Sequence, residues 1–322
     1  MSWHILIIPT VLQSDNTIRR MEHRSGNILD GNDCTGAVAV RWISPAWLDD
    51  HRDTSLPVIV DCRQNSHAYF TNHIPGAVWL SDALLRVHTG LVPVRWLGPE
   101  PAQILLSHIG ISRDEPVVVY SSGGPKSPTG LCTGDGLEQY FVAYSLARYG
   151  CRQVLVLDGG LERWRAEGRP LSHAFGSTTP SGFTADVQES FLIGYNTVVQ
   201  RKDSPGVILL DTRPLAWYEG QGPWSRPGHI PGAVNLPAAM LLNPDNLTLL
   251  KPVGEIQEIL ARAGIVPEKT IICSCGTGRI ATLVFLILKF LLGYPDVLMF
   301  EGGFTEWISH PDNPVVTGKN PR

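Results

Sequence analysis

The strands of this chain are marked by short runs of consecutive apolar residues, with no regular alternation of polar and apolar positions. Each run is rich in Val, Ile or Leu and ends at a polar residue or a turn. Such runs are typical of parallel strands that are buried on both faces of a sheet. They predict strands at residues 58–61, 117–120, 154–158, 207–211, 270–274 and 297–301.

Longer apolar stretches lie between these runs and predict helices. The clearest are residues 137–150 and 280–294, which end at or beside Gly150 and Gly293. Glycine is a common residue at the end of a helix. Strands that alternate with helices indicate an α/β fold, in which a parallel sheet is covered by helices on both faces.

The chain repeats itself. An apolar strand, Asp-x-Arg, His-Ile-Pro-Gly-Ala-Val, a second strand and Gly-Gly-x-x-x-Trp occur twice in the same order. This order indicates a duplicated domain. The second copy has a longer loop before its His-Ile-Pro-Gly, with the sequence EGQGPWSRPG. The matched blocks lie at residues 58–63, 73–78, 117–120 and 159–164 in the first copy and at 207–213, 229–234, 270–274 and 302–307 in the second.

A polar stretch rich in Gly, Ser and Thr separates the two copies and predicts a linker. We therefore expect two α/β lobes with an irregular segment on either side of the first. The expected boundaries are a tail at residues 1–35, a first domain at 36–171, a linker at 172–203, and a second domain at 204–322 that ends in a polar tail.

Composition argues against several classes of protein. The net charge is −4 and no basic stripe is present, so a nucleic-acid-binding role is not expected. No run of eighteen apolar residues occurs, and no basic segment precedes the first apolar run, so neither a membrane span nor a secretory signal is expected. The six cysteines are scattered without a Cys-x-x-Cys pair or metal-ligand spacing, which predicts reduced thiols, a cytoplasmic location and no metal site.

Cys275 lies where candidate chemistry is expected, directly after the strand 270–274. Ligands of parallel α/β units bind at the carboxyl ends of strands. Gly276, Thr277 and Gly278 are small and let the backbone N–H groups curl inward, and the following helix directs its positive end to the same point. Both effects predict a lowered pKa for the Cys275 thiol and a nucleophilic role.

Arg279 is expected at the rim of this site, as a fixed positive charge for an anionic substrate. The alternative for Cys275 is a buried structural cysteine, since free cysteine is often buried. For Cys273, which lies within the strand, core packing is the favoured interpretation.

These blocks together resemble the tandem-domain rhodaneses, a family of sulfurtransferases, over about residues 40–318. The resemblance implies two lobes, each with a mainly parallel five-stranded sheet. It also implies that only the second lobe is catalytic, and Ser121 here stands where the second lobe has Cys275. The active-site loop would run from Cys275 to Ile280, and neither cofactor nor metal would be required.

The resemblance further implies transfer of sulfur through a persulfide on Cys275. Thiosulfate is the favoured donor, because the sequence shows no obvious carboxylate clamp beyond Arg213 and Arg226. The alternative is 3-mercaptopyruvate, because the loop combines Gly276, which resembles the loop of mercaptopyruvate enzymes, with a cationic Arg279. Cyanide or a thiol would be the acceptor. A non-catalytic carrier or scaffold that delivers persulfide to a sulfur-accepting protein is the third interpretation. Phosphatases of a related fold need an arginine six positions after the cysteine, where this chain has Ala281.

Residues elsewhere are expected to assist. Arg213 and Arg226 are candidates for donor binding, and Asp211 and Glu301 for support of the site. For Arg213 a structural ion pair with Asp211 is an equal alternative, and the first-lobe pair Asp61 and Arg63 is expected to be structural. His73 and His229 are expected to bond the local backbone. Trp224 is either a wall of the pocket or a packing anchor between the lobes.

Overall fold

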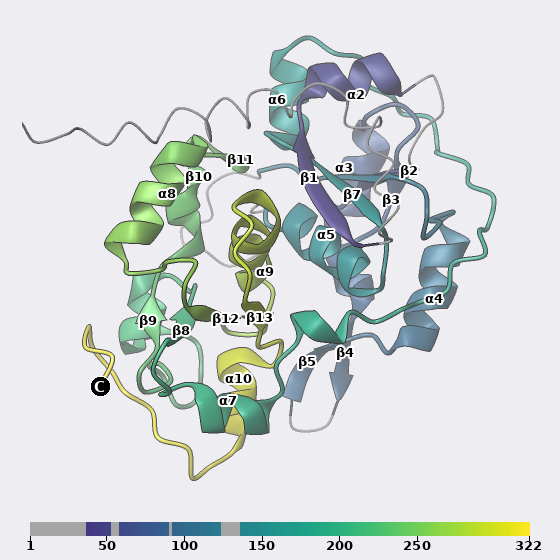
Figure 1. The fold of residues 1–322 in the computed structure, drawn as a ribbon. Coiled ribbons are helices and arrows are strands. Elements are labelled where there is room, and N and C mark those ends of the chain that lie inside the picture. The colour runs from purple at the N-terminus through teal and green to yellow at the C-terminus, as the bar shows by residue number, and fades with distance from the viewer. Residues whose placement is uncertain (1–36, 53–57, 90–91, 124–135) are drawn as a thin grey trace, which may run out of the picture. The chain divides into compact units, whose positions relative to one another are not determined.

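The computed structural model describes residues 37–52, 58–89, 92–123 and 136–322 (Figure 1). The predicted tail 1–35, with Cys34, and Cys132 lie outside the described residues. Residues Val38–Arg322 form one compact unit.

The first lobe contains a five-stranded sheet in the order β1-β7-β6-β2-β3, and every neighbouring pair is parallel. The central strands are buried because both faces of the sheet are covered, as their unbroken apolar runs predict. The strands are β1 (Ala39–Ile43), β2 (Val58–Asp61), β3 (Val78–Trp79), β6 (Val117–Tyr120) and β7 (Gln153–Leu157).

The helices of this lobe connect its strands, and an antiparallel hairpin leaves the sheet after β3. The helices are α2 (Pro45–His51), α3 (Ser66–Thr71), η2 (Asp82–Leu85), α4 (Pro99–His108), α5 (Glu138–Arg148) and α6 (Gly160–Ala166). The hairpin consists of β4 (Arg86–Thr89) and β5 (Val92–Trp96).

The second lobe has a parallel sheet in the order β13-β12-β8-β9. This confirms the predicted parallel α/β lobe, with four named strands where five were expected. At the outer edge of β13, Leu192 makes a single parallel bridge to Met299. The chain leaves η3 (Glu189–Phe191) just before Leu192 and enters α7 (Tyr195–Arg201) soon after, so only a short extended segment remains beside β13 (Val297–Met299). The other strands are β8 (Val207–Asp211), β9 (Val234–Asn235) and β12 (Thr270–Ser274).

Helices and a second hairpin complete this lobe. The predicted helix 280–294 is formed by α9 (Ala281–Leu286), which continues into the π-helical turn η6 (Ile287–Leu291). The remaining elements are η4 (Trp217–Gln221), η5 (Ala238–Leu241), α8 (Val253–Arg262), α10 (Gly303–Ser309) and the hairpin strands β10 (Leu242–Asn243) and β11 (Asn246–Leu250). No helix among the described residues has the length and apolar character to cross a membrane.

The two lobes share one core. Helices α5 and α9 follow equivalent strands of the two sheets and pack against each other, with the rings of Tyr144 and Phe285 in edge contact at 5.1 Å. Each hairpin reaches the opposite lobe: Trp96 of β5 lies beside the second-lobe loop at Gly278, and the Thr248 carbonyl of β11 accepts a hydrogen bond from Tyr140 at 3.0 Å. The loop after β12 is therefore enclosed by residues of both lobes.

Candidate active site at the Cys275 loop

Cys275 directly follows β12, whose neighbours β8 and β13 lie on either side of it. The Cys275 thiol is free and only 1% of the residue is exposed. Cys273, two residues earlier, is fully buried within the strand, and burial raises the pKa of its thiol strongly. The structure therefore places Cys275 at the carboxyl end of a central strand, as predicted from the sequence.

The backbone N–H groups of Ala281, Thr277 and Ile280 lie close enough to the Cys275 sulfur to lower the pKa of its thiol. These donors favour the thiolate, as the predicted curl of the loop requires. Burial has the larger effect, however, and the carboxylate of Asp211 opposes the thiolate too, so the pKa of the Cys275 thiol is raised above its ordinary value. The prediction of a lowered pKa is wrong, because it considered the loop and the helix end without the desolvation that the enclosing lobes impose.

The carbonyl groups of the loop are fixed by the start of α10. The Cys275 oxygen accepts a hydrogen bond from the Phe304 N–H at 2.7 Å, and the Gly276 oxygen accepts one from the Thr305 N–H at 2.9 Å. The repeated Gly-Gly-x-x-x-Trp block therefore supplies backbone donors to the cysteine loop. With its carbonyls held on one side, the loop can present N–H groups to the sulfur on the other.

Two tryptophans pack against the glycines of the loop. A Cβ added to Gly276 would lie within 3.0 Å of the Trp224 ring, and one added to Gly278 would lie 2.5 Å from Trp96. Gly278 also has a φ of +80°, which side-chain-bearing residues rarely adopt. The glycines are thus required by the close approach of one ring from the same lobe and one from the first lobe.

Trp224 packs against the loop as a wall would, but its hydrogen bond and ring contacts among the described residues all lie in the second lobe, so they do not make it an anchor between the lobes. Its indole N–H donates to the Thr305 hydroxyl at 2.9 Å, and its ring makes edge contacts with Trp217 at 5.4 Å and Phe304 at 5.5 Å. The longer loop of the second lobe carries this side chain, and the shorter loop of the first lobe has no counterpart to it.

Two further residues of the loop, Thr277 and Arg279, meet polar side chains of the first lobe. Arg86 donates to the Thr277 hydroxyl at 2.9 Å. Arg279 is 3% exposed and forms ion pairs with Asp82 at 2.7 Å and Glu138 at 3.2 Å. The expectation that Arg279 stands at the rim of the site is wrong, because the docked first lobe covers it and two carboxylates bind its guanidinium.

Glu301 also faces the first lobe. Its carboxylate accepts hydrogen bonds from Arg148 at 2.6 Å and from the Tyr144 hydroxyl at 2.9 Å. Burial raises the pKa of Glu301, and the Arg148 charge opposes that shift. The carboxylate therefore joins the two lobes, and the main-chain oxygen of Glu301 lies beside Gly278 of the cysteine loop.

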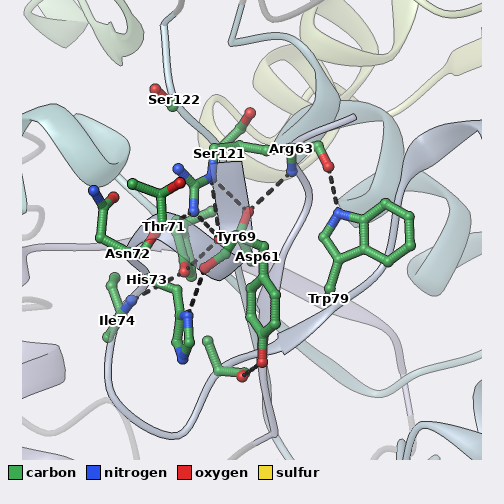
Figure 2. A network of polar contacts seen from close by, with 12 residues as sticks. Asp61, Arg63, Tyr69, Thr71, Asn72, His73, Ile74, Trp79, Ser121 and Ser122 are labelled. Atoms are coloured by element: carbon green, nitrogen blue, oxygen red, sulfur yellow. Dashed lines mark hydrogen bonds and ion pairs between the residues drawn. The ribbon is translucent and has the colours of Figure 1, made fainter. Parts of the chain in front are cut away.

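Asp211 and Arg213 form a buried bidentate pair, with Arg213 Nε 2.9 and 3.0 Å from the two carboxylate oxygens and Nη2 2.6 Å from one of them. Figure 2 shows the first-lobe copy, in which Arg63 binds Asp61 at nearly the same distances. In each lobe the arginine also donates to a backbone carbonyl ahead of the His-Ile-Pro-Gly turn. This shared geometry supports the structural interpretation of Asp-x-Arg.

Arg213 nevertheless differs from its first-lobe copy in its surroundings. Its guanidinium lies over the rings of Phe304 at 4.2 Å and Trp224 at 4.8 Å, both of which contact the cysteine loop. The buried Nη1 of Arg213 has no hydrogen-bond partner among the described residues. One donor of Arg213 therefore remains available beside the site.

Arg226 anchors the long loop to the C-terminal segment. Its guanidinium donates to the backbone carbonyls of His310, Pro311 and Asn313. The two histidines of the repeated turns point at the backbone, as predicted: His73 Nδ1 lies 2.8 Å from the Tyr69 oxygen, and His229 Nδ1 lies 2.8 Å from the Tyr218 oxygen. Among the described residues, no group of His, Cys, Asp and Glu is arranged to hold a metal ion.

Sequence reasoning missed the first-lobe contributors, which are Asp82, Arg86, Trp96 and Glu138. One of them had a signal, because Glu138 is the only acidic residue of the predicted helix 137–150. The others could be placed only once the lobes were docked.

Comparison with known proteins agrees with this architecture. The sequence pattern of the family described as Rhodanese-like domain matches residues 44–167 and 195–310. A Synechococcus elongatus protein with the provisional name thiosulfate sulfurtransferase is 34% identical, over 87% of this chain and 86% of its own length. The 3-mercaptopyruvate sulfurtransferase of Escherichia coli is 28% identical, over 85% of this chain and 97% of its own.

A third relative, the sulfur carrier protein TtuD of Thermus thermophilus, is 28% identical over 86% of this chain and 96% of its own length. Among solved structures, a variant of EanB in complex with hercynine superposes with a TM-score of 0.77 at 24% identity, covering 86% of this chain and 69% of that one. At this identity the likeness concerns the fold.

Proposed function

Because this chain belongs to the rhodanese family of sulfurtransferases, we propose that it transfers the outer sulfur of thiosulfate to a thiol or cyanide through a persulfide on Cys275. The observation that carries the proposal is the position of the Cys275 sulfur. It lies at the end of β12, where the backbone N–H groups of Ala281, Thr277 and Ile280 favour its anionic form. This arrangement stabilises the Cys275 thiolate, which attacks in the first step and leaves in the second.

The reaction has two steps. The Cys275 thiol first loses its proton to solvent, and the thiolate attacks the outer sulfur of thiosulfate. The bond between the two sulfurs of thiosulfate breaks, and sulfite leaves with the bonding electrons. The acceptor then attacks the outer sulfur of the persulfide, and the Cys275 thiolate leaves. No net oxidation or reduction by an external reagent is required, so the proposed reaction needs no cofactor.

A compact donor is supported by the enclosure of the site. Cys275 is almost fully buried, and Trp224 and Trp96 close on either side of its loop. The guanidinium of Arg226 is used by backbone carbonyls and that of Arg279 by two carboxylates, so neither is placed as a ready clamp for an organic carboxylate. Thiosulfate is small and dianionic, and needs no such clamp.

Arg213 is the proposed cation for the donor. Its Nη1 is buried and unpartnered among the described residues, and the rest of the guanidinium is held rigid by Asp211 and two aromatic rings. Asp211 would act by fixing this orientation. A rigidly held hydrogen-bond donor beside the Cys275 sulfur is suited to bind a compact anion such as thiosulfate.

The donor is tested by comparing steady-state kinetics with thiosulfate and 3-mercaptopyruvate, each with cyanide and with a small thiol as acceptor. We expect the larger kcat/KM with thiosulfate. A larger value with 3-mercaptopyruvate would assign the chain to the second donor, for which the Escherichia coli relative is named. Persulfide formation without turnover on either small acceptor would support a carrier that delivers sulfur to a protein, and would refute the proposed acceptors.

A further inference from the structure

The first lobe has no cysteine at its equivalent site, and the structure shows what occupies that position. Ser121 follows β6 as Cys275 follows β12. Its hydroxyl donates to the Glu138 carboxylate at 3.0 Å, and its N–H donates to the Gln139 side chain at 2.9 Å. All three residues are fully buried. We call this position around Ser121 the silent site. It is filled by side chains from the start of α5.

Glu138 extends from this silent site to the catalytic loop. One carboxylate oxygen binds Ser121, and the other pairs with Arg279 Nη2 at 3.2 Å. From a different element, η2, Asp82 accepts from Arg279 Nε at 2.7 Å. The side chains of Glu138, Asp82 and Arg279 are between 0% and 4% exposed. Charge-assisted hydrogen bonds in a buried setting fix geometry strongly, because each unpaired alternative would leave a buried charge.

Arg279 lies within the segment that supplies N–H donors to the Cys275 sulfur. Thr277 precedes it by two residues, and Ile280 and Ala281 follow it directly. Its own carbonyl accepts from the Thr282 hydroxyl at 2.7 Å, at the start of α9. A guanidinium held on two sides therefore restrains the path of the backbone on which all three donors depend.

We propose that Glu138 and Asp82 are positioning residues, which hold the Cys275 loop through Arg279, so that the lobe with Ser121 at the equivalent position sets the reactivity of Cys275 in the other lobe. The silent site thereby helps to hold the loop that carries Cys275. This inference deepens the proposed sulfur transfer, but it concerns the thiol itself and can be tested without any sulfur donor.

The test measures the rate of Cys275 alkylation by iodoacetamide as a function of pH, read on the peptide 270–279 by mass spectrometry, in the parent and in Glu138→Gln. The substitution keeps the size of the side chain but removes its charge. The titratable groups near Cys275 that belong to its own lobe, Asp211 and Cys273, are the same in both proteins. The control is Glu115→Gln, which makes the same change at an exposed residue of the first lobe.

The sign of the result discriminates between mechanisms. Loss of a nearby negative charge alone would favour the thiolate and move the alkylation profile to lower pH. Loss of the held loop weakens the N–H donors, so we expect the profile to move to higher pH, with alkylation about tenfold slower near neutral pH for a shift of one pKa unit. The Glu115→Gln profile should not move.

A Glu138→Gln profile that is unchanged, or that moves to lower pH, would overturn the proposal. Asp82→Asn gives an independent test from the other side of Arg279, should Glu138→Gln not fold, and the same two outcomes apply to it. A melting curve of each variant shows that alkylation is measured on folded protein. Failure of the parent to accept sulfur from thiosulfate would refute the proposed function and leave this test unaffected.

Discussion

Gly276→Ala tests the packing of the active-site loop most sharply. An added Cβ would lie 3.0 Å from Trp224 Cη2 and nearer still to Cζ2, whereas ordinary contact begins at 3.4 Å. At Cζ2, its closest atom, the ring must therefore retreat by about 1 Å. Its hydrogen bond to Thr305 at 2.9 Å and its contacts with Trp217 and Phe304 resist that movement.

The magnitude follows from these contacts. Overpacking a well-ordered region costs typically about 1–3 kcal/mol, and loss of the indole hydrogen bond adds about 1 kcal/mol. We expect Gly276→Ala to lower the free energy of unfolding by about 2–4 kcal/mol. In a Trp224→Ala background the space is open, and the same change should cost less than about 0.5 kcal/mol, because an alanine also restricts the unfolded chain.

The assay is urea unfolding of the parent, the two single variants and the double variant. The expected coupling between the two positions is about 2 kcal/mol in favour of the double variant. Gly254→Ala is the matched control, because nothing lies within 4 Å of the added atom and it sits in helix α8. It should be neutral or slightly stabilising. An equal cost of Gly276→Ala in both backgrounds would refute the steric argument.

Two further predictions concern charge. Because burial raises the pKa of the Cys275 thiol, the thiolate fraction should keep growing as the pH rises. The rate of persulfide formation from thiosulfate, measured by stopped flow, should therefore rise without a plateau below about pH 8.5, the ordinary pKa of cysteine. A plateau near neutral pH would show that the loop donors outweigh burial. Arg279→Met would leave Asp82 and Glu138 buried without this counter-charge and should cost about 3–5 kcal/mol in urea unfolding. If Arg279→Met lowers the free energy of unfolding no more than a surface variant such as Glu115→Gln does, the two carboxylates find other partners.

The features that could be predicted from sequence are those that one lobe specifies by itself. Unbroken apolar runs identified the buried parallel strands, and repetition identified two lobes. The position of Cys275 after β12 followed from the same pattern, because the residue after a parallel strand lies at the edge of the sheet where ligands bind. The backbone contacts of His73 and His229 followed from their tight turns.

The features that could not be predicted depend on how the lobes dock. Arg279 follows a small-residue turn and reads as a rim cation, but two first-lobe carboxylates and helix α5 bury it. The same enclosure desolvates Cys275 and reverses the expected direction of its pKa shift. No local pattern near residue 275 reports the charge at Asp82 or the ring of Trp96, which lie far away in the sequence and close in space.

The intact mass of the protein, measured after incubation with thiosulfate and removal of excess donor, shows whether Cys275 carries the transferred sulfur. The parent should gain the mass of one sulfur atom and lose it again on addition of cyanide. Cys275→Ser should gain nothing, since a hydroxyl is not ionised near neutral pH and cannot form a persulfide. A parent that stays unmodified, or a Cys275→Ser protein that gains the same sulfur, would contradict the account.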